Sequence, residues 1–152
     1  MGAMFLFSGA TFRNKTLSVT VPLAALLVSD YAVVKFLYDD LYNWLMTSPW
    51  PGFALVAITG WLLRGRITWL RVAGTSLAGS VVFFFASNFM VWLTGALYPV
   101  TASGLKTCFI QAIPFFGNTL LGDLFYAAVF FGSYEFVRRR MQATAAISVA
   151  TK

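Results

Sequence analysis

The sequence has no histidine, a single cysteine and few charged side chains. Charged residues make up 11% of the 152 positions, against about 25% in a typical soluble domain, while hydrophobic residues make up 59%. So few charges cannot cover a water-facing surface, and we therefore expect one membrane domain. One cysteine excludes a disulfide-built secreted domain, and the lack of histidine argues against a zinc or nickel site.

Features of an enzyme are also missing from the sequence. It contains no nucleophile with a neighbouring base, no Gly-rich phosphate loop and no His-Glu-x-x-His metal motif. Asp30 and Asp123 could form an acid–base pair in an intramembrane hydrolase, but no spacing supports that pairing. Cys108 is more typical of a small buried apolar residue than of a nucleophile. The net charge of +6 comes from short basic clusters, which in such a chain indicate membrane topology rather than nucleic-acid binding. We expect no enzymatic activity, cofactor, metal or nucleic-acid partner.

Long uncharged runs predict the membrane segments. Leu41–Leu63 and Val72–Leu105 carry no charge over 23 and 34 residues, whereas about 20 apolar residues suffice for a helix to cross the hydrocarbon layer. Because the runs are continuous, they favour helices over a barrel. We expect an all-α polytopic domain over residues 1–140, with about five membrane helices and one short segment. A polar cytoplasmic tail over residues 141–152 follows, and we expect it to be frayed over Ala143–Lys152. The segments are Gly2–Phe12, Leu17–Phe36, Pro51–Leu63, Val72–Gly95, the short Gly104–Ile113 and Asn118–Arg138.

The distribution of Lys and Arg predicts the orientation. Two basic residues, Lys35 and Lys106, are placed outside and nine in the cytoplasm, including the run Arg138–Arg140 and Lys152. The other five cytoplasmic ones are Arg13, Lys15, Arg64, Arg66 and Arg71. This arrangement requires Gly104–Ile113 to begin and end outside, as a re-entrant or interfacial piece. If that segment crossed fully, three arginines would face outward, and we therefore prefer the re-entrant interpretation.

Under this topology, polar side chains inside the apolar runs fall in the outer half of the bundle. An ionisable group in a membrane segment is costly unless it faces protein or water, so these residues predict a polar, substrate-binding cavity open to the outside. The candidates are Asp30, Asn88, Trp92, Asn118, Asp123 and Tyr126.

Five of these six candidates also have a structural interpretation. Asn118 follows Pro114 and could be an N-cap, and Asp123 in the second turn could be stabilised by the helix dipole. Asn88 could bond a neighbouring helix, and Trp92 could belong to an interfacial aromatic belt. Asp30 could pair with a basic residue.

Several motifs occur in an order that resembles an uncharacterised family of small bacterial membrane proteins. They are Gly2–Phe12, Val21–Asp30, Ser87–Trp92, Tyr98–Pro99 and Pro114–Tyr126, and the similarity covers nearly all of residues 2–137. By its architecture this family resembles the substrate-binding (S) components of energy-coupling-factor vitamin transporters.

The resemblance implies six helices in the bacterial inner membrane, both termini in the cytoplasm and a substrate pocket near the outer face. It also implies transmembrane and ATPase partner subunits. The short first segment then corresponds to the second helix of that fold, so the usual first helix, which docks on the coupling subunit, is missing. We expect either a truncated start or a protein that has lost coupling.

Two functions remain open from the sequence. The first is a membrane-embedded binding component for uptake, whose two carboxylates would favour a cationic solute and whose Trp92 and Tyr126 would stack on a ring. The second is a structural or accessory subunit of a larger membrane complex, with Asp30 and Asp123 in helix–helix contacts. Twelve glycines suit close helix packing in either case.

Overall fold

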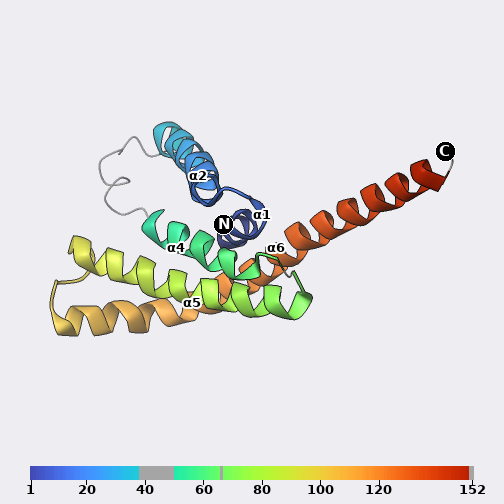
Figure 1. Cartoon of the computed structure of the whole chain (residues 1–152). Coiled ribbons are helices and arrows are strands. Elements are labelled where there is room, and N and C mark those ends of the chain that lie inside the picture. The colour runs from blue at the N-terminus through green and yellow to red at the C-terminus, as the bar shows by residue number, and fades with distance from the viewer. Residues whose placement is uncertain (38–49, 66, 151–152) are drawn as a thin grey trace.

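The computed structural model describes residues 1–37, 50–65 and 67–150, and within these residues it contains helices and no strand (Figure 1). The all-α prediction is confirmed. In chain order the elements are α1 (Gly2–Thr11), α2 (Lys15–Leu37), α4 (Trp50–Gly60) with a 3₁₀ turn η1 (Trp61–Leu63), α5 (Trp69–Thr94) and α6 (Ala102–Ala150).

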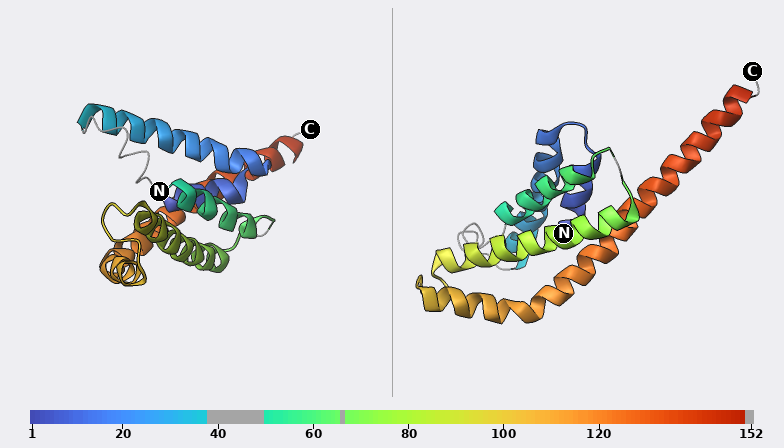
Figure 2. Two further views of the ribbon diagram at one scale, coloured as in Figure 1. Left: turned by 90° about the vertical axis from the view of Figure 1, so that its left-hand side faces the viewer. Right: turned by 60° about the horizontal axis from the view of Figure 1, so that its bottom comes forward.

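The frame of the molecule is an antiparallel hairpin of α5 and α6, which pack along each other (Figures 1 and 2). Thr68 caps the start of α5, where its hydroxyl accepts a hydrogen bond from the backbone N–H of Arg71. Gly95 ends α5 in the left-handed conformation, with φ of 66°, which glycine adopts without steric cost. The chain then returns through residues 96–101 into α6. We call this end of the hairpin the loop end.

Two short helices, α1 and α4, pack against the half of the hairpin away from the loop end. At about 1.5 Å per residue, the 10 and 11 residues of these helices reach only about half the thickness of a bilayer core. Their backbones are in direct contact, because a Cβ added to Gly60 would collide with the Leu6 carbonyl and one added to Gly9 with the Ala57 carbonyl. The buried core lies here, around Phe5 and Phe131.

Helix α2 is peripheral. Among the described elements it contacts α1 and α4 but neither α5 nor α6. Pro22 lies inside it and is buried, as is possible in a membrane helix whose neighbours compensate the lost backbone hydrogen bond.

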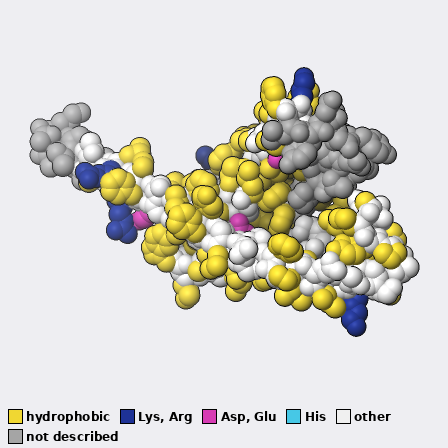
Figure 3. All heavy atoms as spheres, turned by 180° about the vertical axis from the view of Figure 1, so that it is seen from behind, with side chains coloured by type: hydrophobic (Ala, Val, Ile, Leu, Met, Phe, Trp, Pro, Cys, Tyr) yellow, Lys and Arg dark blue, Asp and Glu magenta, His cyan; other side chains and the backbone are white. Residues whose placement is uncertain are grey.

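Within the part of the chain that the structure describes, three helices are long and apolar enough to cross a membrane: Lys15–Phe36, Trp69–Thr94 and Ala102–Thr144. Two further apolar helices, Gly2–Thr11 and Trp50–Leu63, are shorter. Hydrophobic side chains spread over much of the described surface in Figure 3, and Lys and Arg side chains appear at its margins. The chain is a helical membrane protein.

The expected short segment Gly104–Ile113 is wrong as a separate element. It forms the first turns of α6, which continues through Pro114 to Ala150 and so includes residues 141–150 of the expected tail, while residues 151–152 lie outside the described residues. A proline interrupts an exposed helix, but inside a membrane bundle it commonly only bends one, and Figure 2 shows that α6 bends partway along its length.

The continuous α6 also removes the reason for a re-entrant segment, because α5 and α6 run in opposite directions and return the chain to the end where α5 begins. Seven basic residues gather there: Arg13, Lys15, Arg64, Arg71, Arg138, Arg139 and Arg140. Two sets of contacts bring the elements together at this basic end. The Arg64 guanidinium donates to the Gly9 and Phe12 carbonyls at the end of α1, at 2.9 and 2.8 Å. The Trp69 ring, at the start of α5, lies against Gly132 of α6. These seven belong to the nine that the charge pattern placed on one side of the membrane; the other two, Arg66 and Lys152, lie outside the described residues.

Candidate functional site

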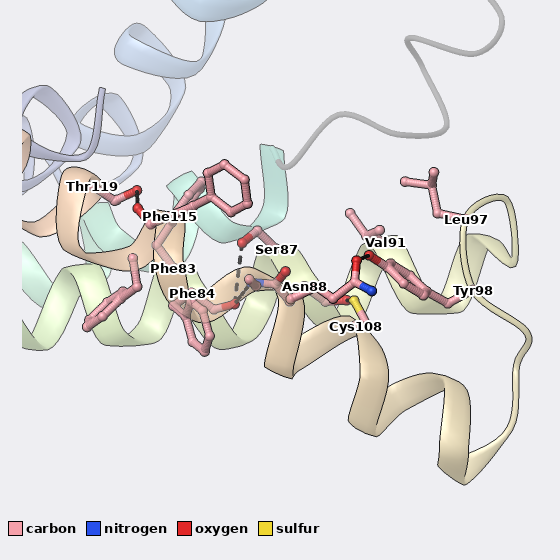
Figure 4. A pocket seen from close by; sticks show the side chains of 13 residues that line it. Phe83, Phe84, Ser87, Asn88, Val91, Leu97, Tyr98, Cys108, Phe115 and Thr119 are labelled. Atoms are coloured by element: carbon pink, nitrogen blue, oxygen red, sulfur yellow. Dashed lines mark hydrogen bonds between the residues drawn. The ribbon is translucent and has the colours of Figure 1, made fainter.

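A cavity of about 320 Å³ lies between α5 and α6 near the loop end (Figure 4). We call it the hairpin pocket. Its apolar walls are Phe83, Phe84, Val91, Leu97, Ala112, Phe115 and Phe116. Its polar lining is Ser87, Asn88, Tyr98, Cys108, Gln111 and Thr119.

Aromatic packing and backbone contacts hold the walls of the hairpin pocket in place. The Phe84 ring meets Phe109 and Phe116 of α6 edge-on, with centroids 5.7 and 5.1 Å apart. The Asn88 amide nitrogen donates to the Phe84 carbonyl one turn earlier at 2.7 Å, and the Cys108 thiol donates to the Asn88 carbonyl at 3.4 Å. Cys108 is buried, so it ties the two helices together as the expected small packing residue.

The hairpin pocket keeps hydrogen-bonding capacity for a ligand. Tyr98, in the loop, donates its hydroxyl to the Gln111 side-chain oxygen at 3.2 Å. Among described residues, nothing accepts from the Gln111 amide nitrogen and nothing donates to the Asn88 side-chain oxygen. The lining therefore offers one amide donor and one amide acceptor. Among the described residues, none that lines it is charged.

A second cavity of about 220 Å³ borders the first, sharing Phe83 and Thr119 with it. Asn118, Asp123 and Tyr126 line this second cavity together with the first residues of the chain. The six predicted site residues are therefore divided, because Asn88 lines only the hairpin pocket.

Asp123 is buried and hydrogen-bonded to two neighbouring helices. Its side chain is 8% exposed and accepts hydrogen bonds from the Ala3 backbone N–H at 3.2 Å and from the Ser80 hydroxyl at 2.9 Å. A Cβ on Gly2 would lie 2.7 and 2.8 Å from the two carboxylate oxygens, so α1 can approach this closely only with glycine there. No cation pairs with Asp123 within the described part of the chain. The carboxylate fastens the first turn of α1 to α5 and α6.

The remaining two predicted site residues lie elsewhere. Trp92 donates its ring N–H to the Thr101 carbonyl at 3.2 Å and bridges α5 to the loop without lining either cavity. Asp30 lies on α2, which does not contact α5 or α6. Sequence depth placed these residues at one level, but it could not tell which face of each helix they occupy. The prediction of one shared cavity for Asp30, Asn88 and Asp123 is therefore wrong.

The candidate site residues predicted from the sequence did not include Tyr98, Cys108 and Gln111, which the sequence places only in the outer connection between two apolar runs. It also missed Ser80, which looks like any small residue of a packed membrane helix. For metal binding, no group of three or more His, Cys, Asp or Glu side chains comes together among the described residues.

Residues 1–145 match a family of unknown function (DUF6580), and the chain belongs to this family. The expectation of an uncharacterised family is confirmed. No curated protein and no solved structure matches the chain. The resemblance to transporter S components stays a prediction.

Proposed function

We propose that this DUF6580 member is a small-molecule-binding membrane component of an uptake system, and that it holds its ligand in the hairpin pocket. The observation that carries the proposal is the cavity itself. Its volume of about 320 Å³ lies at the lower end of the range of about 300–1,000 Å³ for small-molecule sites. Mostly apolar walls with a few polar groups are also typical of such sites.

The lining indicates a neutral ligand with a ring and a polar edge. Aromatic walls favour stacking or edge contacts with a ring, and the amides of Asn88 and Gln111 can orient a donor–acceptor edge. The two aspartates that suggested a cationic solute do not line this pocket. We therefore replace the expected cation with a neutral solute of the size of a small vitamin or nucleobase.

The transport context is argued from charge. With the basic end in the cytoplasm, the loop end and its pocket face outward, as an uptake component requires. The C-terminal end of α6 then lies on the cytoplasmic side of the bacterial inner membrane, where transmembrane and ATPase subunits would be reached. The resemblance to S components supports the same arrangement.

A second candidate function is a structural subunit of a larger membrane complex. It is favoured by Asp123, whose buried carboxylate is used for helix–helix contacts instead of facing a ligand. In that case the hairpin pocket would be filled by a partner protein or by lipid.

The test compares pocket variants with a matched control on the same helix. Asn88→Leu and Gln111→Leu keep the approximate side-chain volume but remove the amides. Thr107→Leu changes an exposed residue of α6, one turn before Gln111, that does not line the pocket. The protein is purified in mild detergent, and bound small molecules are measured by native mass spectrometry with equal amounts of folded protein.

Each pocket variant should lose about three- to tenfold in affinity for the co-purified solute, as expected for one neutral hydrogen bond, and Thr107→Leu should bind like the parent. Equal retention by all three variants would place the solute outside the hairpin pocket. Recovery of the protein only with a fixed partner chain, and with no small molecule, would favour the structural subunit.

A further inference from the structure

We propose a separate binding site for the headgroup of an anionic phospholipid at the basic end of the bundle. A cavity of about 260 Å³ lies between the start of α5 and the middle of α6, far from the hairpin pocket. We call it the basic-end pocket. Its lining combines four apolar side chains with polar ones, namely Ile67, Thr68, Trp69, Val72, Phe131, Glu135 and Arg139.

The ion pair that lines the basic-end pocket leaves part of the Arg139 guanidinium unused. Glu135 accepts a hydrogen bond from the Arg139 Nε at 2.8 Å, and its other oxygen lies 3.8 Å from an Arg138 terminal nitrogen. One carboxylate thus positions two guanidinium groups and leaves a net positive charge. Within the described residues, nothing accepts from the two terminal amino groups of Arg139, whose side chain is 76% exposed. A guanidinium presented in this way suits bidentate contact with a phosphate.

The walls of this pocket suit an amphiphile better than a free anion. The Trp69 ring lies over Gly132 of α6, because a Cβ added to Gly132 would be in van der Waals contact with the ring at 3.5 Å. Trp69 nevertheless remains 59% exposed. Leu70, beside it, is 86% exposed. Tryptophan prefers the boundary between headgroups and hydrocarbon. A lipid phosphate at Arg139 would therefore extend its acyl chains along the exposed apolar side chains of this region.

The balance of charge selects an anionic lipid over a zwitterionic one. Of the residues gathered at the basic end, seven are basic, and Glu135 is the one acidic side chain that the described residues bring to them. Basic residues next to a membrane segment attract anionic headgroups, each contributing about 1 kcal/mol near the surface.

The experiment uses the full chain in detergent and two adjacent charge-removing variants. Arg139→Gln removes the guanidinium that lines the basic-end pocket. Arg140→Gln removes the same charge one residue on, where the guanidinium lies over the Phe136 ring at 5.3 Å and does not line the pocket. Binding of phosphatidylglycerol, phosphatidylcholine and inorganic phosphate is measured by native mass spectrometry and by thermal shift.

We expect phosphatidylglycerol to bind more tightly than phosphatidylcholine, Arg139→Gln to lower its affinity about tenfold, and Arg140→Gln to lower it less than about twofold. Three results would overturn the proposal. Equal losses in both variants would show diffuse attraction to the whole basic end. Equal binding of both lipids would show an uncharged contact. Inorganic phosphate binding as tightly as phosphatidylglycerol would show a site for a free anion.

Discussion

Replacing Asp123 with leucine removes two acceptors, one for the Ala3 N–H of α1 and one for the Ser80 hydroxyl of α5. The Ser80 hydroxyl keeps a second acceptor, the Ser76 carbonyl at 3.0 Å. The Ala3 N–H has no such alternative among the described residues and would be left unpaired in a buried position. An unpaired buried donor costs about 1–3 kcal/mol, so Asp123→Leu should lower the free energy of unfolding by about that amount.

Asparagine at the same position should behave differently. Its side-chain oxygen can accept from the Ala3 N–H, and its amide nitrogen can donate to the Ser80 oxygen while the Ser80 hydroxyl turns to the Ser76 carbonyl. The substitution also removes a buried charge that has no ion-pair partner within the described residues. The free energy of unfolding of Asp123→Asn should therefore lie within about 1 kcal/mol of that of the parent.

The measurement is reversible unfolding in mixed micelles, followed by circular dichroism and tryptophan fluorescence. Asn118→Leu is the matched control, because Asn118 lines the same cavity but is exposed and makes no hydrogen bond to another described residue. The expected order of stability is parent, Asp123→Asn and Asn118→Leu together, with Asp123→Leu clearly lowest. If Asp123→Leu and Asp123→Asn are equally stable, Asp123 does not act as an acceptor for α1 and the reasoning fails.

Three further predictions follow from the packing and topology. Gly60→Ala should destabilise the protein by about 1–3 kcal/mol, since its Cβ meets the backbone of α1, whereas Gly74→Ala on the open side of α5 should cost little; equal unfolding midpoints would contradict the close contact. Arg64→Gln should lower the midpoint because two carbonyls at the end of α1 lose charge-assisted hydrogen bonds, and an unchanged midpoint would show that solvent replaces them. In a cysteine-free background, Ser103→Cys should react quickly with a membrane-impermeant maleimide added from the loop side. Gly117→Cys lies about 21 Å further along α6 and should react slowly or not at all. Equal reaction rates would favour the re-entrant interpretation of Gly104–Ile113.

Charge gaps and apolar runs predicted the helices well, because a membrane leaves few alternatives to a continuous helix. The expected segments Pro51–Leu63 and Val72–Gly95 correspond to α4 with η1 and to α5, and their bounds agree within a few residues. Clustering of the basic residues was predictable for the same reason: charges are confined to the ends of such segments. The gathering of Arg64 and Arg139 at one end agrees with that expectation.

Two things could not be read from the sequence. Pro114 looked like a boundary, since proline interrupts helices in water, but neighbouring helices allow α6 to continue through it. The partners of each polar residue depend on the face of the helix and on which helices pack together. Depth along the chain placed Asp30 and Asp123 at the same level, whereas among the described elements α2 packs on α1 and α4 and not on α6. The contact of Asp123 with Ala3 joins residues 120 positions apart and leaves no local pattern.

That long separation has a consequence for biosynthesis. The chain is synthesised from its N-terminus, so α1 emerges well before the carboxylate that will hold its first turn. At 10 residues, α1 is too short to be a stable span by itself, and the Ala3 N–H can reach its acceptor on Asp123 only after α6 has been inserted. The docking of α1 must therefore be a late step of assembly. A chain that stops before Asp123 would leave α1 without this anchor, and such a chain should be a substrate for membrane quality-control proteases.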